Sequence, residues 1–136
     1  DGMKNLSELL KLTWLNLGGV DISEEGLTHL APLTKMRVLD LGGVSLSCNG
    51  LKVLENMSEL MWLNLGGTGI CNEGLDFLKN FKQLAWLNIG GNPISDEGIV
   101  YLEPLKHLTE LYLMGTKISP SGLESLNEKL AYCLVS

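Results

Sequence analysis

The sequence repeats with a fixed period of 24 residues. Leu12, Met36, Leu60, Leu84 and Leu108 occupy the same place in five successive units, with no insertion or deletion between them. A short, constant period predicts a solenoid, in which each unit buries its apolar side chains only against its neighbours. With conservative exchanges, the units follow the pattern L-x-x-L-x-L-G-G-x-x-I-S-x-E-G-L-x-x-L-x-x-L-x-x.

The first half of each unit predicts a short strand. Trp14 and Asn16 alternate with the apolar residues Leu15 and Leu17, and successive side chains of a strand point to opposite sides. A Gly-Gly pair, such as Gly18-Gly19, follows and predicts a turn. Because the same connection recurs in every unit, we expect the strands to run parallel.

The second half of each unit predicts a short helix or a single helical turn. Apolar residues recur three apart, as at Leu27, Leu30 and Leu33, and give one buried stripe. A glycine precedes each stripe, which indicates either tight packing between neighbouring turns or a dihedral that only glycine tolerates. A serine precedes each predicted turn in four units, where its oxygen is expected to cap the first amides: Ser23, Ser47, Ser95 and Ser119.

This pattern resembles the leucine-rich repeat, and its second half is similar to the 24-residue repeats of bacteria and some protozoa. The resemblance implies an α/β solenoid with a curved parallel sheet on the concave side and short helices or turns on the convex side. It covers five units at 12–131 and extends upstream into a partial unit at 1–11. We predict that residues 1–136 form one array, with an apolar tail at 132–136. We expect the tail to add a sixth strand, shifted by about one residue.

The turn after the strand departs from the family pattern. Most leucine-rich repeats have an asparagine there that bonds neighbouring backbones. Val20 and Val44 cannot make that bond, so we expect the first two units to rely more on packing or water. The full column reads Val20, Val44, Thr68, Asn92 and Thr116.

Charge and cysteine content narrow the classes of partner and compartment. A net charge of −6 argues against nucleic acid as the main partner. No stretch approaches the roughly 20 apolar residues of a membrane helix. The odd number of cysteines indicates free thiols and favours a cytoplasmic location, although Cys48 and Cys71 fall at nearly equivalent turn positions where a bridge is the alternative. The start inside a unit predicts a longer protein, or self-association through uncapped ends.

Three columns of side chains are predicted to face solvent on the concave side of the sheet. Trp62 and Trp86 stand on adjacent strands and should touch, because neighbouring strands lie about 4.8 Å apart. The columns are Trp14, Val38, Trp62, Trp86, Glu110; Asn16, Asp40, Asn64, Asn88, Tyr112; and Gly18, Gly42, Gly66, Gly90, Met114.

Each column has a binding interpretation and a structural one. Exposed Trp side chains often carry binding energy, but stacked Trp can also simply stiffen a sheet. The Asn/Asp column suits a peptide backbone or forms ordinary polar ladders. The glycines leave backbone open to a partner or serve only the turn. We predict a partner-binding site comprising Trp14, Trp62, Trp86, Asn16, Asp40, Asn64, Asn88, Glu110, Tyr112 and Met114.

The sequence favours a protein–protein interaction module with a protein partner. No nucleophile–base pair or metal-ligand spacing recurs on the concave columns, so we predict no enzyme, cofactor or metal. One alternative is the substrate-recognition segment of a larger ligase or effector, which leucine-rich arrays often provide. Another is a glycan-binding surface on which Trp62 and Trp86 act as stacking platforms.

Overall fold

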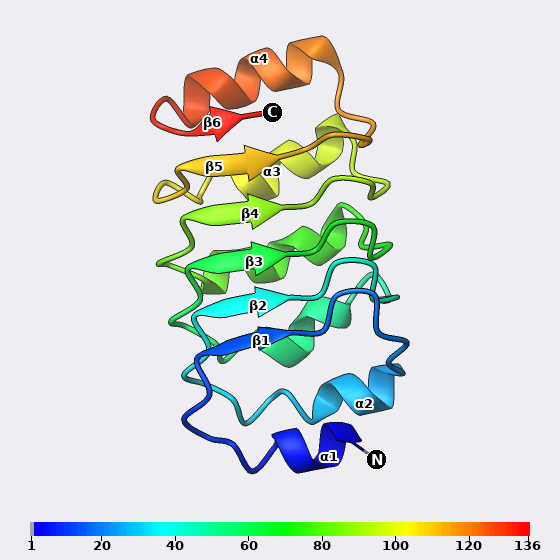
Figure 1. Cartoon of the computed structure of the whole chain (residues 1–136). Helices are drawn as coiled ribbons and strands as arrows, with labels where there is room; N and C mark the ends of the chain where they lie inside the picture. Colours follow the sequence, from blue (N-terminus) through cyan, green and yellow to red (C-terminus); the bar gives the residue numbers. More distant parts are fainter. Residues whose placement is uncertain (1) are drawn as a thin grey trace.

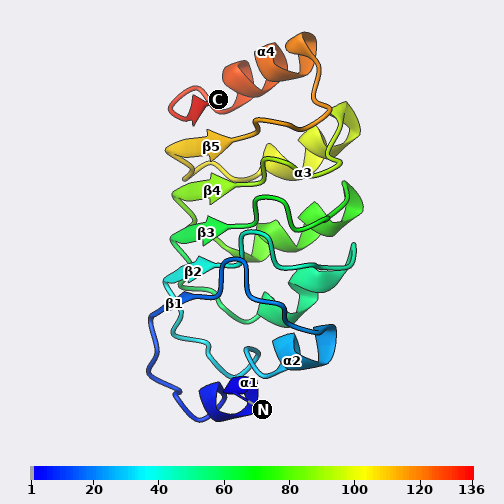
Figure 2. The same ribbon diagram turned by 45° about the vertical axis from the view of Figure 1, so that its right-hand side comes forward.

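The computed structural model describes residues 2–136, which form a stack of two layers (Figure 1). One layer is a single sheet and the other contains the short helical segments, as the turned view in Figure 2 makes plain. The strands are β1 (Trp14–Asn16), β2 (Val38–Asp40), β3 (Trp62–Asn64), β4 (Trp86–Asn88), β5 (Glu110–Tyr112) and β6 (Leu134–Val135). The helical segments are α1 (Gly2–Leu6), α2 (Glu24–Thr28), η1 (Gly50–Leu54), η2 (Glu73–Asn80), η3 (Asp96–Gly98), α3 (Ile99–Leu102) and α4 (Pro120–Lys129).

The strands pair in sequence order, and all of them run parallel. The strands β1 to β5 are short because a glycine in the left-handed region turns the chain just beyond each of them; Gly43, for example, has φ 74°. The predicted sixth strand is present. The expected shift is wrong, because Glu110 pairs with Leu134 and Leu111 with Val135, which keeps the 24-residue register.

The core lies between the two layers and is built from the repeated leucine positions. Leu63 from β3 and Leu78 from η2 are fully buried, as are their equivalents Leu39 and Leu54 one unit earlier. Full burial of such a side chain contributes about 1.5–3 kcal/mol relative to exposure. The apolar stripe of the second half-unit therefore packs inward against the sheet, as the 3-residue spacing predicts.

Close approach of the preceding unit explains the glycine that opens the apolar stripe at Gly74, Gly98 and Gly122. A Cβ atom at Gly74 would collide with the carbonyl oxygen of Cys48 in the preceding unit. Gly74 is not among the glycines with positive φ. Of the two explanations offered by the sequence, close approach rather than an unusual dihedral applies at Gly74.

The serine caps are confirmed at only two of the four expected positions. The hydroxyl oxygens of Ser23 and Ser119 accept from the amides of Gly26 and Gly122, both at 3.1 Å. The prediction is wrong for Ser47 and Ser95, which cap no helical segment with their side chains. There the segments are 3-10 turns, and the serines bond to the preceding unit instead.

A recurring side-chain link joins each unit to the next at the start of the helical segment. Glu24 accepts from the amide of Ser47 at 3.1 Å. Asn72 both accepts from the Ser95 amide and donates to its hydroxyl. Asp96 accepts from the Ser119 amide at 2.8 Å and from its hydroxyl at 2.6 Å, and these hydrogen bonds, the hydroxyl's first, lower the pKa of Asp96.

Cys48 and Cys71 occupy this same linking position and form a disulfide, with Cα atoms 5.1 Å apart. The expectation of three free thiols is therefore wrong for this pair, and only Cys133 is free. The reason is geometric: the stacking that brings Asp96 to Ser119 also brings two cysteines within the Cα range of a disulfide.

The residue that follows each strand's turn glycine is a valine in the first two units and a polar residue in the later ones. Asn92 is buried, and its amide donates to the carbonyls of Leu65 at 2.7 Å and Ile89 at 2.9 Å, while its oxygen accepts from the Gly69 amide at 2.7 Å. Val44 at the equivalent position is fully buried without polar side-chain contacts, as the expected reliance on packing requires. Val20 is half exposed.

We call the turns at 18–24, 42–48, 66–72, 90–96 and 114–120 the turn edge of the stack.

Candidate functional site

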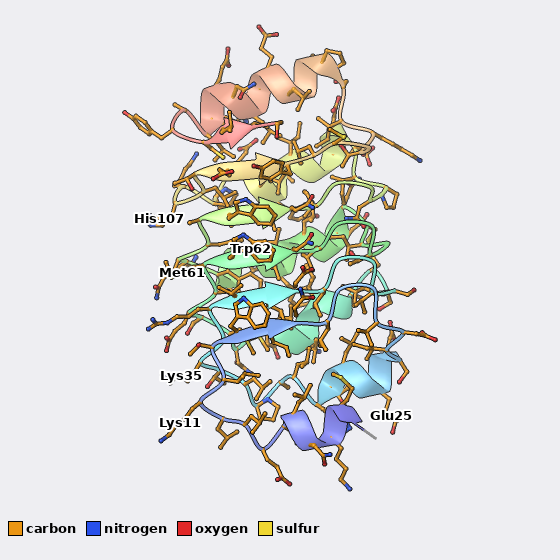
Figure 3. All side chains as sticks on the ribbon, in the orientation of Figure 1. Lys11, Glu25, Lys35, Met61, Trp62 and His107 are labelled. Atoms are coloured by element: carbon orange, nitrogen blue, oxygen red, sulfur yellow. A yellow bond between two sulfur atoms is a disulfide. The ribbon has the colours of Figure 1, made fainter. Side chains whose placement is uncertain are left out.

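The three predicted columns lie on the strand layer, on the side opposite the helical segments. Figure 3 shows Trp62 at the centre of this surface, whereas Lys11, Lys35 and His107 project from the turns that lead into the strands. We call this surface the sheet face and define it by the residues of the three columns: Trp14, Val38, Trp62, Trp86, Glu110; Asn16, Asp40, Asn64, Asn88, Tyr112; Gly18, Gly42, Gly66, Gly90, Met114.

The predicted contact between Trp62 and Trp86 is present. Their rings stack with centroids 4.2 Å apart and planes 9° apart. Tyr112 continues the cluster, with its ring centroid 5.1 Å from that of Trp86 and its plane tilted by 40°. The register of the parallel strands produces this contact, because Trp62 and Trp86 are direct cross-strand partners.

Trp14 lies apart from the cluster and is much more exposed. Its strand partner is Val38, whose other partner is Trp62, so a small side chain stands between two indoles. Trp14 is 61 % exposed, while Trp62 is only partly exposed. A hollow of about 360 Å³ opens above Val38, and it is lined by Trp14, Leu15, Asn16, Val38, Asp40 and Trp62.

Val38 and Leu15 are the two residues of this hollow that the predicted site does not include, and of these only Val38 belongs to the sheet face. The sequence already shows Val38 as the one aliphatic residue in a column that is otherwise tryptophan over the first four strands. A small side chain between two large ones predicts a gap, but only the paired register shows that both indoles border it.

The Asn/Asp column mainly stabilises the ends of the strands. Each side-chain oxygen accepts from the amide two residues later: Asn16 from Gly18, Asp40 from Gly42, Asn64 from Gly66 and Asn88 from Gly90, at 2.8–3.0 Å. Asn64 also donates to Asp40 at 2.9 Å, which is the polar ladder that the structural interpretation anticipated. One oxygen of each residue is therefore already used within the protein.

The glycine column is closely surrounded. A Cβ atom at Gly42 would approach the side-chain nitrogen of Asn64 at 2.7 Å, and one at Gly90 would approach the carbonyl oxygen of Met114 at 2.7 Å. The glycines thus leave space that the neighbouring unit already occupies. This packing accounts for Gly42 and Gly90 without a partner.

The last unit brings different chemistry to the sheet face. The hydroxyl of Tyr112 donates to a carboxylate oxygen of Glu110 at 2.6 Å. This hydrogen bond, assisted by desolvation, raises the pKa of Tyr112 above its usual value. Met114 is 86 % exposed and is the most accessible apolar residue of the predicted site.

Among residues 2–136, one cluster has the composition of a metal site. It comprises Cys48, Cys71 and Glu73. The two sulfur atoms are joined in the disulfide, which removes them as thiolate ligands. Within the same described residues, no helix combines the length and apolar character needed to span a bilayer.

Comparison with known proteins identifies the repeat. A family model described as "Leucine Rich repeat" matches residues 87–102 and 105–126. No curated protein matches the chain significantly. The family model matches two stretches of the chain, and the parallel sheet with its regular turns agrees with it, so these findings support a leucine-rich repeat fold.

Three solved bacterial structures share the fold. Internalin C2 of Listeria monocytogenes is 26 % identical with a TM-score of 0.75, over 97 % of this chain and 54 % of that one. A leucine-rich repeat protein of Leptospira interrogans is 22 % identical with a TM-score of 0.68, over 96 % of this chain and 38 % of that one. The internalin InlF of Listeria monocytogenes is 20 % identical with a TM-score of 0.58, over 97 % and 49 %. The chain thus spans roughly half, or less, of these structures.

Proposed function

We propose that the chain is a protein–protein interaction module whose sheet face binds a protein partner. Leucine-rich repeat folds generally serve protein interaction, and solenoids offer extended surfaces for it. The observation that carries the proposal is the gathering of all three tryptophans in one column of an otherwise polar, uncovered surface. Trp combines large contact area with few rotatable bonds, which suits a binding anchor.

The two parts of the Trp column have different roles in this proposal. Trp62, Trp86 and Tyr112 form a preassembled aromatic ridge, so a partner would not have to order these side chains again. Trp14 is isolated and 61 % exposed. Its packing within the protein offers little stabilisation, so burial against a partner is the larger effect to expect there.

Glycan binding finds less support in the geometry. A sugar needs a free indole face on which to lie. In the predicted Trp62–Trp86 platform each ring covers one face of the other at 4.2 Å, which leaves the outer face of Trp62 as the free face of the pair. The second face of Trp86 is directed to Tyr112. Protein binding makes no such demand, because side chains can pack against ring edges as well as faces. Recognition of a substrate for a larger enzyme would use the same sheet face and is a special case of the proposal.

The direct test compares capture of partners by the wild type and by the double variant Trp62→Ala/Trp86→Ala. Val100→Ser provides a matched control, since Val100 is an exposed apolar residue of α3 in the helical layer. We expect partners to be retained by the wild type and by Val100→Ser, but lost by the double variant, with all three proteins folded. Equal capture by the double variant and the wild type would overturn the proposal.

A further inference from the structure

The Trp column has a gap between Trp14 and Trp62. The two indoles belong to strands two steps apart, and Val38 on the strand between them is too short to fill the space. Two strand spacings amount to about 9.6 Å. A planar group that packs at about 3.5–4 Å from each of two walls needs about 7–8 Å between them. The spacing between the two strands exceeds this requirement. The hollow of about 360 Å³ above Val38 therefore has room for one flat group between the two indoles.

The next gap in the column is already closed. Trp62 and Trp86 lie on adjacent strands, and their centroids are 4.2 Å apart, so nothing enters between them. One face of Trp62 is used in that stack. Trp62 also lines the hollow, together with Trp14.

The hollow carries a negative charge on one side. Asp40 lines it, and only one of the Asp40 carboxylate oxygens is used: Oδ1 accepts from the Gly42 amide and from the Asn64 side chain, both at 2.9 Å. Within residues 2–136, Oδ2 has no hydrogen-bond partner. A group that enters the hollow therefore lies beside two indoles and beside a carboxylate with one unused oxygen.

The basic side chains closest in sequence to Val38 and Asp40 form ion pairs outside the hollow. Lys35 and Arg37 precede β2, and both bond Glu59 at 2.8 Å and 3.3 Å. Their hydrogen bonds lower the pKa of Glu59, which keeps it charged and paired with them. No basic residue lines the hollow itself.

A planar cation matches this set of groups. Indole faces attract cations through their quadrupole, and a guanidinium stacks on aromatic rings while donating to a carboxylate. A lysine ammonium is compact and strongly hydrated, so it stacks poorly. A neutral aromatic ring would stack but would desolvate the Asp40 carboxylate without compensation. The net charge of −6 also favours a cationic partner.

We propose that the slot between Trp14 and Trp62, with Val38 as its floor and Asp40 at its side, binds an arginine side chain of the protein partner. This inference rests on the proposed function, because it names the partner chemistry that one part of the sheet face recognises. The indoles stack on the guanidinium from both sides, and Asp40 Oδ2 accepts a hydrogen bond from it.

The chain supplies matched variants for a test. Asp40→Asn removes the charge alone, because Asn16, Asn64 and Asn88 make the same oxygen-to-glycine-amide contact at equivalent positions. Val38→Trp fills the slot with a residue that the column already holds on three other strands. Both variants are expected to fold.

The first measurement titrates N-acetyl-arginine amide into the protein and follows the three indole N–H signals by NMR. N-acetyl-citrulline amide, which is neutral and of similar shape, and N-acetyl-lysine amide serve as control probes. We expect saturable shifts of the Trp14 and Trp62 signals with arginine. Binding should weaken about tenfold in Asp40→Asn, because hydrogen bonds to charged groups are the stronger class, and should vanish in Val38→Trp.

Two outcomes would contradict arginine binding in the slot. One is equal binding of arginine and citrulline, and the other is arginine binding that survives Val38→Trp. The capture experiment distinguishes a failure of this inference from a failure of the proposed function. If capture survives Asp40→Asn and Val38→Trp but is lost in Trp62→Ala/Trp86→Ala, the slot is wrong and the sheet face still binds. If capture survives all three, the proposed function itself fails.

Discussion

Side chains of the turn edge bond the next unit, whereas the indoles of the sheet face project from the same units into solvent. Asp96 reaches Ser119 and Cys48 is joined to Cys71, and both links leave little for a partner to bind. Trp14, by contrast, is 61 % exposed and makes no aromatic contact with Trp62 across the gap at Val38. Under the proposed function, substitutions on the turn edge should mainly lower stability, and substitutions on the sheet face should mainly lower capture of the partner.

The largest loss of stability is expected from Asn92→Ala on the turn edge. The change leaves the Gly69 amide and the Ile89 carbonyl without their side-chain partner and empties a buried site. We expect a decrease of about 3–4 kcal/mol in the free energy of unfolding, since each buried unsatisfied group costs about 1–3 kcal/mol. Urea denaturation measures it. Val20→Ala in the same column is the control, and its half-exposed side chain should cost less than about 0.5 kcal/mol.

The second largest loss of stability is expected from removal of the Cys48–Cys71 disulfide. Cys48→Ser/Cys71→Ser removes a cross-link between residues 23 apart in sequence, for which chain entropy predicts a loss of about 3 kcal/mol. Cys48→Asn/Cys71→Ser should recover part of that loss, because it copies the hydrogen-bonded pair Asn72 and Ser95 one unit later. Thermal unfolding of both variants tests this. Equal stability of the wild type with and without reductant would show that the link contributes nothing.

On the sheet face, Trp86→Ala should cost more stability than Trp14→Ala. Trp86 loses its stack on Trp62 and its contact with Tyr112, and aromatic pairs contribute about 0.5–1.5 kcal/mol each beyond area burial. Trp14 has no such pair, so its removal should change the melting temperature by less. Differential scanning calorimetry of the two variants makes the comparison. A larger loss at Trp14 would mean that the exposed indole is structural.

The smallest effect is a dependence of stability on pH at the Asp96–Ser119 link. The pKa of Asp96 is lower in the folded chain than in the unfolded chain, because Ser119 donates to the charged form. The stabilisation is therefore complete above the usual carboxyl range and disappears as the pH falls through the lowered pKa. Melting temperatures of the wild type and Asp96→Asn should converge at acidic pH. A difference that does not change with pH would contradict this origin.

The repeat predicts the backbone of this fold well because its determinants are local and periodic. The strands follow from alternation, their parallel direction follows from the recurring connection, and the Trp62–Trp86 contact follows from a 24-residue offset between adjacent strands. The register of β6 was missed because Tyr132 replaces the leucine that marks each unit, and the tail's apolar residues could be aligned in more than one way.

Contacts between units were harder to predict because they depend on side-chain geometry. Ser47 and Ser95 have the sequence signature of caps, yet they precede 3-10 turns, whereas Ser23 and Ser119 precede α-helices and cap them. The disulfide was missed because an odd number of cysteines says nothing about distance, whereas stacking fixes the Cα separation at 5.1 Å. The hollow over Val38 likewise required the register of three strands.

The most direct test of the account maps the captured partner onto the chain. Two-dimensional NMR of the labelled protein, before and after addition of that partner, reports the indole N–H signals and the backbone amides together. The account predicts that the signals of Trp14, Trp62 and Trp86 shift while the amides around Val100 in α3 remain in place. Shifts confined to the helical layer, with unchanged indole signals, would contradict it.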